Sequence, residues 1–335
     1  MTDQQFDSDI RKAELKPVYF LYGEETYLVS RAQKRLLDVA VDPDTKDFNL
    51  SVFYGAECTA VQVVDAASTL PMFAERRVVL LKNIDKLPTD GHDRMLAYLA
   101  DPAPDTCLIC VATKPDMRRK LYAELKKQPG SLECKKIYDN RLAPFVIAEA
   151  QTMGKRIEKA AADVLVFLIG NQLQSLITQL EKLVIVVGGR DTITVSDVQA
   201  SVSSVKEFTA FEFAAAVGLK DLEQALRSLD TLLRNASDSY TVVGSLASHM
   251  RRLWRVRELM DAAASNDQIV AATKIPAFFL KDALLHAKNY RCSELQQVIL
   301  DLYEADRNIK SGRGGGVTNV LYQLVYQIIQ PQSLP

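Results

Sequence analysis

Phosphate binding is the first chemistry to test, and the sequence departs from the pattern it needs. A nucleotide-phosphate loop reads G-x-x-x-x-G-K-[ST], because glycines let backbone N–H groups cradle the phosphates while the lysine and the hydroxyl serve phosphate and magnesium. The first apolar segment ends instead in GEETYL at 23–28. The Gly154-Lys155 pair is followed by Arg156 and has Glu149 in place of the first glycine. The chain therefore lacks a P-loop.

The acid that would hold magnesium is also missing from its usual place. P-loop ATPases carry this acid directly after an apolar strand. Here the apolar run VVLL is followed by Lys82 and Asn83, and Asp85 comes too late. A divergent nucleotide site would have to use the turn at 23–25 together with Thr113, and glutamates at that turn would repel phosphate. We expect no catalytic residue and no cofactor, and a divergent ATPase is kept as an alternative.

Cysteine and histidine do not form a metal site by their spacing. Cys107 and Cys110 share the strand-like run CLICVA, where alternation places them on opposite faces. No second Cys pair or His pair completes a zinc site. The histidines His92, His249 and His286 are far apart and lack a nucleophile motif. We expect buried core cysteines and no metal.

An apolar pair lies in a connection where polar residues are usual. Pro71 ends a helix at Leu70, since the residue before a proline avoids the α region. Met72 and Phe73 follow, ahead of the third apolar strand. Two interpretations remain open: the pair is an exposed anchor for another protein, or both side chains fold back onto their own domain.

Two basic clusters are candidates for contact with DNA or with a partner protein. One lies at the start of a helix and the other within a long helix; they comprise Arg118, Arg119 and Lys120, and Arg251, Arg252 and Arg255. Either cluster also fits a solvated helix surface or a face between subunits. The formal net charge of -1 gives no overall attraction to nucleic acid, so any DNA contact would be local.

The elements that position these residues change type along the chain. Up to about residue 140, apolar strands alternate with helices, which predicts a parallel sheet; the strands are expected at 17–23, 51–54, 78–81, 107–112 and 132–137. After that, apolar residues recur with helical spacing. The fold class is therefore α/β plus all-α, with an α/β domain at 1–140, a small helical domain at 141–208 and a larger helical domain at 209–335.

The bulk properties fit a cytoplasmic protein. The 335 residues are 48% hydrophobic and 25% charged, which is ordinary for globular domains. The cysteine number, five, is odd, the N-terminus does not read as a signal peptide, and no run is long enough to span a membrane. We expect a reduced cytoplasm and no membrane contact.

The chain resembles the delta subunit family of the bacterial DNA polymerase III clamp loader over essentially its whole length. The resemblance is carried by PVYFLYGEETYLV at 17–29, PMFAERRVVLLKNIDKL at 71–87, the segment 169–198, FTAFEFAAAV at 208–217, LRSLDTLLRN at 226–235 and DLYEADRNIKSG at 301–312. Their order and spacing together are specific, although no single segment is a catalytic signature.

The resemblance implies an AAA+-like domain without a P-loop, a small helical lid domain and a C-terminal helical collar for oligomerisation. It implies an accessory subunit of a DNA-directed DNA polymerase (nucleotidyltransferase) holoenzyme that is no enzyme on its own. Such a subunit opens the sliding clamp without hydrolysing ATP during DNA replication. Its clamp-binding element is an apolar pair, usually Leu-Phe, which Met72 and Phe73 match with methionine in place of leucine.

The implied partners are the sliding clamp (beta subunit), the gamma/tau and delta-prime subunits through the collar, and primer-template DNA within the assembly. A helical adaptor unrelated to replication remains a further alternative to this interpretation.

Overall fold

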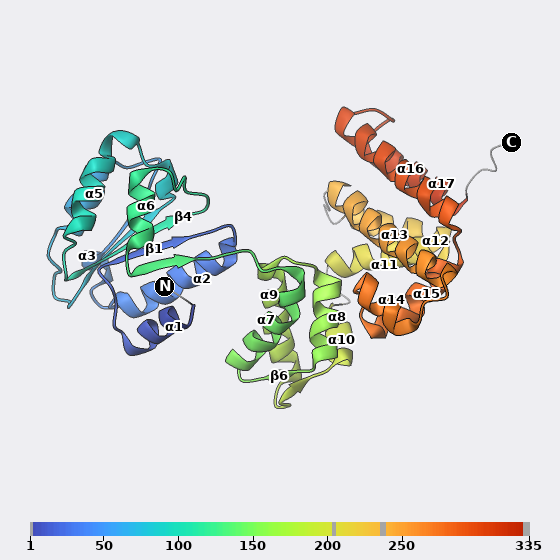
Figure 1. The fold of residues 1–335 in the computed structure, drawn as a ribbon, viewed down its shortest axis with the longest axis horizontal. Helices are drawn as coiled ribbons and strands as arrows, with labels where there is room; N and C mark the ends of the chain where they lie inside the picture. The colour runs from blue at the N-terminus through green and yellow to red at the C-terminus, as the bar shows by residue number, and fades with distance from the viewer. Residues whose placement is uncertain (1–2, 203–205, 235–238, 331–335) are drawn as a thin grey trace. The chain divides into compact units, whose positions relative to one another are not determined.

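The computed structural model describes residues 3–202, 206–234 and 239–330, which fall into two compact units (Figure 1). The first unit is Met1–Tyr138 and the second is Asp139–Pro335. The first contains a five-stranded sheet and the second is mostly helical, so the predicted α/β plus all-α class is confirmed.

The sheet of the first unit is parallel throughout, with the strand order β2-β3-β4-β1-β5. Its strands are β1 (Val18–Tyr22), β2 (Leu50–Tyr54), β3 (Arg77–Lys82), β4 (Thr106–Ala112) and β5 (Gly130–Glu133). The apolar runs suit this sheet because helices cover both of its faces. Leu81 lies opposite Cys110 and Tyr22 opposite Ala112, so the chain leaves β1, β3 and β4 at the same edge.

Alternating side chains divide the core of this unit into two layers. One face packs against α1 (Asp3–Lys12) and α2 (Thr26–Ala40). The other packs against α4 (Ala60–Ala67), α5 (His92–Ala100) and α6 (Lys120–Lys127). Cys107 belongs to the first layer and Cys110 to the second, as the alternation predicted. Burial raises the pKa of both thiols to about 12, which keeps them protonated and unreactive.

Short elements complete the first unit. The helix α3 (Lys46–Asn49) leads into β2, and the turns η1 (Ile84–Lys86) and η2 (Thr89–Gly91) follow β3. Asn49, the last residue of the four-residue α3, is buried.

The second unit begins with four helices and a two-stranded parallel pair. The helices are α7 (Asp139–Thr152), α8 (Lys159–Ile169), α9 (Leu173–Val187) and α10 (Val195–Val202), and the strands are β6 (Arg156–Ile157) and β7 (Thr192–Ile193). The sequence predicted helices alone after residue 140. A strand of two residues is too short to show any alternation.

The rest of the second unit is helical. Its elements are α11 (Lys206–Leu219), α12 (Leu222–Arg234), α13 (Ser239–Asp261), α14 (Asn266–Thr273), η3 (Ala277–Phe279), α15 (Leu280–Lys288), α16 (Cys292–Ser311) and α17 (Val317–Ile329). Buried side chains of α11, α12, α13, α16 and α17 form one core. No helix in the described ranges combines the length and hydropathy needed to cross a bilayer.

An aromatic cluster joins α8 to the later helices. The ring of Phe167 stacks on Phe279 at 5.2 Å between centroids and meets Phe211 edge-on at 5.9 Å. The guanidinium of Arg252 lies 4.8 Å from the centre of the Phe167 ring. The two predicted helical domains thus touch within the second unit, and the division between them at 208/209 stays a prediction.

Two histidines face each other in the core of the second unit. His249 on α13 and His286 on α15 are both buried, with ring centroids 5.9 Å apart. His249 Nε2 and His286 Nδ1 have no hydrogen-bond partner among the described residues. Burial, together with Arg252 and His286, lowers the pKa of His249 to about 3. Burial also lowers the pKa of His286, against the opposing effect of Asp282.

We therefore expect stability to fall as the pH drops below the ordinary histidine pKa of 6.5. Below this pH, His249 becomes protonated in the unfolded chain but stays neutral in the folded protein. The stability present above that pH is therefore lost on acidification. His249 alone accounts for about 2 kcal/mol by pH 5. Urea midpoints measured at pH 7, 6 and 5 test this. His249→Leu should show a shallower decline than the wild type, and equal slopes would contradict the assignment.

Candidate functional site

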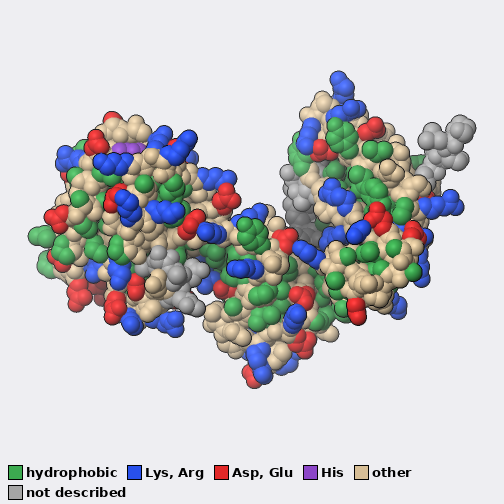
Figure 2. All heavy atoms as spheres, viewed as in Figure 1, with side chains coloured by type: hydrophobic (Ala, Val, Ile, Leu, Met, Phe, Trp, Pro, Cys, Tyr) green, Lys and Arg blue, Asp and Glu red, His purple; other side chains and the backbone are tan. Residues whose placement is uncertain are grey.

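The apolar pair ahead of β3 lies in the loop that connects α4 to β3. The side chain of Phe73 is 88% exposed, that of Leu70 is 74% exposed and that of Met72 is 49% exposed. Of the two open interpretations, the geometry is that of a projecting pair. Figure 2 shows hydrophobic side chains projecting from the left-hand edge of the first unit, where Figure 1 places α3.

The loop is held from one side by Asn49. The Met72 N–H donates to Asn49 Oδ1 at 2.8 Å, and Asn49 Nδ2 donates to the Met72 carbonyl at 2.7 Å. Asn49 Nδ2 also donates to the Thr45 carbonyl at 3.2 Å. Asn49 is only 4% exposed, so its amide is a buried support beneath an exposed loop.

Arg77, the first residue of β3, holds the other side of the loop. Its guanidinium donates to the Ala66 carbonyl at 2.8 Å, to the Phe48 carbonyl at 3.1 Å and to Ser51 Oγ at 3.1 Å. The end of α4, the end of α3 and the start of β2 are thereby tied together. Neither Asn49 nor Arg77 stands out in the sequence, because their partners are distant along the chain.

Phe73 has a left-handed backbone conformation, with φ of 56°. A non-glycine residue in this conformation costs roughly 1–2 kcal/mol. Such strain persists only where the surroundings impose it, and it is typical of functional positions. Here the residue that carries the strain is also more exposed than Leu70 and Met72.

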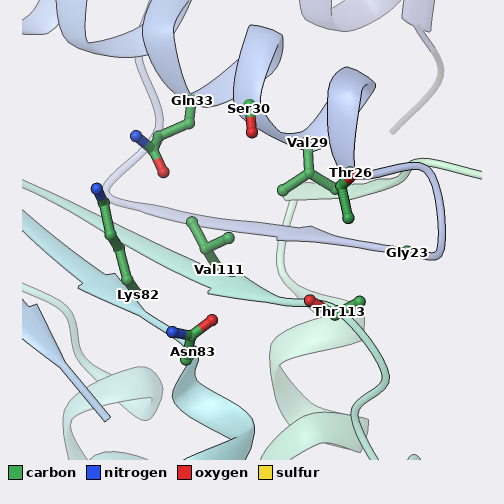
Figure 3. Close-up of a pocket in the computed structure, with 9 residues that line it drawn as sticks. All are labelled: Gly23, Thr26, Val29, Ser30, Gln33, Lys82, Asn83, Val111 and Thr113. Atoms are coloured by element: carbon green, nitrogen blue, oxygen red, sulfur yellow. The ribbon is translucent and has the colours of Figure 1, made fainter. Parts of the chain in front are cut away.

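A second candidate, a pocket, lies at the edge of the sheet where β1, β3 and β4 end (Figure 3). Its volume is about 240 Å³, slightly below the ~300–1,000 Å³ of ordinary ligand sites. The helices α2 and α6, which follow β1 and β4, cover opposite faces, and open α/β sheets bind ligands at such a point. The lining residues are Gly23, Thr26, Val29, Ser30, Gln33, Lys82, Asn83, Val111 and Thr113.

A divergent nucleotide site would need the turn at 23–25 together with Thr113, and this pocket is lined by Gly23 of that turn and by Thr113, but not by Glu24 or Glu25. It offers Lys82, whose ammonium lies 5.5 Å from the centre of the Tyr54 ring, and several neutral polar groups. None of its lining residues is an aspartate or a glutamate, so the pocket lining lacks the carboxylate through which proteins usually hold magnesium.

The turn after β1 is already engaged in internal hydrogen bonds. The Gly23 N–H donates to the Ala112 carbonyl at 3.3 Å, and the Glu25 N–H donates to the Cys134 carbonyl at 3.2 Å. A Cβ on Gly23 would lie 2.1 Å from the Cys134 oxygen. Gly23 is thus required by the close approach of the chain after β5. Two of the N–H groups that could cradle a phosphate are occupied.

Lys155 of the Gly-Lys pair has a structural role in the second unit. Its Nζ donates to the Gly188 carbonyl at 2.7 Å and to the Arg190 carbonyl at 2.8 Å. These acceptors follow the end of α9, where carbonyl groups lack helical partners. The lysine therefore closes the connection between α9 and β7.

The first basic cluster lies at the start of α6. Arg118 is exposed and binds Asp116 through two hydrogen bonds of 2.8 and 3.0 Å. Those bonds lower the pKa of Asp116 to about 2. Arg119 and Lys120 are exposed and form no ion pair within the described ranges. They are the freer cations of this cluster.

The second basic cluster does not present one surface. Arg251 is exposed, and Arg255 is exposed and paired with Glu258 at 3.0 Å. Arg252 is instead half-buried against Phe167, and burial lowers its pKa. The candidates Arg251 and Arg255 are thus the ones accessible for a contact with DNA or a partner.

Comparison with known proteins gives a consistent family. The family model described as DNA polymerase III, delta subunit matches residues 19–135, and a second model, for the C-terminal domain of the same family, matches residues 207–325. The DNA polymerase III subunit delta of Bacillus subtilis (strain 168) is 30% identical over 314 residues, covering 91% of this chain and 90% of that protein. The probable DNA polymerase III subunit delta of Aquifex aeolicus (strain VF5) is 24% identical over 302 residues, covering 86% and 85%.

A solved structure agrees with the sequence comparisons. The Bacillus subtilis DNA clamp loader delta protein is similar with a TM-score of 0.63 and 28% identity, over 98% of this chain and 99% of that one. The family models, the curated relatives and this structure all correspond to the resemblance carried by the segments between residues 17 and 312. The chain therefore belongs to the DNA polymerase III delta subunit family of clamp-loader proteins.

Proposed function

We propose that this protein binds the sliding clamp through Met72 and Phe73, flanked by Leu70 and Pro71, and opens the ring for loading onto primed DNA. The observation that carries the proposal is an 88% exposed phenylalanine at the tip of a loop held by Asn49 and Arg77. An exposed aromatic residue on a rigid support is suited to fill an apolar pocket of a partner. Family membership supplies the partner.

Ring opening would follow from differential affinity. We call Met72 and Phe73 the tip. If the tip binds an open or strained interface of the clamp ring better than a closed one, binding shifts the clamp toward the open form. The protein then needs no chemical step of its own. Energy from ATP would enter through the gamma/tau subunits, which would control whether the tip is accessible.

We propose that the chain does not hydrolyse ATP. The pocket at the sheet edge has no carboxylate among its lining residues, and the turn after β1 has already used two N–H groups. Saturable micromolar binding of ATP and magnesium in a calorimetric titration would favour the alternative of a divergent AAA+-type ATPase. Failure to co-purify with ATPase subunits would favour the alternative of a helical adaptor.

The remaining assignments belong to the same proposal. The helical part from 209 would serve as a collar for the gamma/tau and delta-prime subunits, and 141–208 would serve as the lid. The accessible basic residues Arg118, Arg119, Lys120, Arg251 and Arg255 would contact primer-template DNA or partners, whereas Arg252 is covered by Phe167. The protein would act in the cytoplasm as an accessory, non-enzymatic subunit of the polymerase holoenzyme.

A topological experiment tests ring opening. A closed clamp cannot leave circular DNA, so its release reports an open ring. The wild-type chain, without nucleotide, should release clamps from nicked circles, and a Met72→Ala, Phe73→Ala double variant should not. Linear DNA, from which clamps slide off in every case, is the control. If the clamp stays on the circular DNA at concentrations of wild-type protein that bind it, the proposal of ring opening would be contradicted.

A further inference from the structure

We infer that Asn49 is a positioning residue for clamp binding, which acts by fixing the conformation in which Phe73 is presented. The inference rests on the proposed function of the tip. Asn49 lies 23 residues before Met72 in the sequence, yet its side-chain amide forms two hydrogen bonds with the Met72 backbone. Asn49 itself is 4% exposed and is not available as a contact surface.

The amide is matched to the backbone of Met72. Its oxygen accepts the Met72 N–H and its nitrogen donates to the Met72 carbonyl, as a neighbouring β-strand would do. The second amide hydrogen can then serve the Thr45 carbonyl, which anchors the same group within α3. A carboxylate of the same shape keeps only the acceptor half and places negative charge beside two carbonyl oxygens. Alanine removes both halves.

Phe73 follows the residue held by the two Asn49–Met72 hydrogen bonds, which together form the Asn49 bracket, and Phe73 has the strained backbone. Phe73 has φ of 56°, a conformation that side-chain-bearing residues adopt only when the surroundings hold it. With Met72 fixed on one side and Arg77 bonded to three groups on the other, few conformations remain for residues 73–76. Removal of the bracket lets Phe73 relax into ordinary backbone regions. Binding must then bear the cost of ordering the loop again.

The bracket acts locally because Arg77 and the strand are held independently of it. Arg77 bonds to Ala66, Phe48 and Ser51, and none of these three bonds uses the Asn49 side chain. Val78 and Val79 of β3 are buried in the sheet. The loss of Asn49 should therefore loosen the tip without releasing β3.

A double-mutant cycle with the full-length chain and purified sliding clamp tests the inference. Asn49→Ala should weaken binding roughly tenfold in the Phe73 background and have almost no effect in the Phe73→Ala background, because the bracket acts through that ring. Asn49→Asp should weaken binding at least as much. Thr45→Val, which removes a buried hydroxyl without a partner but leaves the bracket intact, is the matched control and should bind as the wild type does.

Hydrogen exchange gives a readout that general destabilisation would not reproduce. In Asn49→Ala the Met72 amide should exchange faster while the amides of 78–81 keep their protection.

Full additivity of the two substitutions, or wild-type binding by Asn49→Ala and Asn49→Asp, would overturn the inference and leave the clamp-binding tip intact. Wild-type binding by Phe73→Ala would instead overturn the proposed tip itself.

Discussion

Phe73→Ala should weaken binding of the purified sliding clamp by roughly 2–4 kcal/mol, about 30- to 700-fold in dissociation constant. Phe73 is 88% exposed in the free protein, so most of its apolar surface is available for burial on binding. Its backbone is held before any partner arrives, so little ordering cost is added. Met72→Ala should have a smaller effect, because the Met72 side chain is already half-covered.

A titration with fluorescently labelled clamp measures the effect, and Tyr303→Ala provides the control. Tyr303 on α16 is also an exposed aromatic residue, but it lies in the second unit and outside the tip. Its truncation should leave the affinity of the isolated chain for the clamp unchanged. Equal losses from the two substitutions would show that any exposed ring contributes and would remove the special role of Phe73.

Gly23→Ala should destabilise the first unit by at least about 3 kcal/mol. The added Cβ would lie 2.1 Å from the carbonyl oxygen and 2.7 Å from the carbonyl carbon of Cys134. Both atoms are backbone, so neither can rotate away as a side chain would. In addition, φ of 144° is a conformation that favours glycine.

Gly312→Ala separates the two causes. Gly312 also has a positive φ, of 67°, in the left-handed helical region, but a Cβ there meets nothing within 4 Å. It should cost only about 1 kcal/mol, the backbone contribution alone. Urea unfolding followed by circular dichroism measures both variants. A Gly23→Ala protein as stable as Gly312→Ala would mean that the close contact with Cys134 is absent in solution.

The order of elements in the first unit was predictable because its strands are continuous apolar runs. VVLL at 78–81 and CLICVA at 107–112 became β3 and β4, buried on both faces as expected. The fifth strand was less accurate: it was expected at 132–137 and spans Gly130–Glu133. A short edge strand with polar residues carries a weak pattern, since one of its sides lacks a neighbouring strand.

The helical character of the second unit was predicted, but individual caps and contacts between its helices were not. Ser265 caps the start of α14 through a reciprocal pair of hydrogen bonds with Gln268, and the neighbouring Asn266 and Asp267 are residue types that also occur in turns. Capping residues and turn residues are the same types, so the two outcomes look alike in sequence. Arg252 was grouped with surface cations, yet it lies against Phe167 from a helix far earlier in the chain.

The sequence indicated the exposed residues of the candidate site but not the residues that support them. An apolar pair after a proline marked Met72 and Phe73, but the choice between projection and folding back required the exposed fractions. The sequence did not indicate that Asn49 holds the loop. Asn49 lies just before the strand expected at 51–54 and carries no pattern of its own, and only the fold brings its amide to Met72.

A photocrosslink from position 73 tests whether the Phe73 ring contacts the sliding clamp. With p-benzoylphenylalanine in place of Phe73, illumination of the full-length chain mixed with the sliding clamp should join the two proteins covalently, at residues lining an apolar pocket of the clamp. The same group at position 303 should not crosslink. A crosslink from position 303 with none from position 73 would rule out clamp binding through Phe73, as would the absence of any crosslink from position 73 under conditions where the two proteins bind.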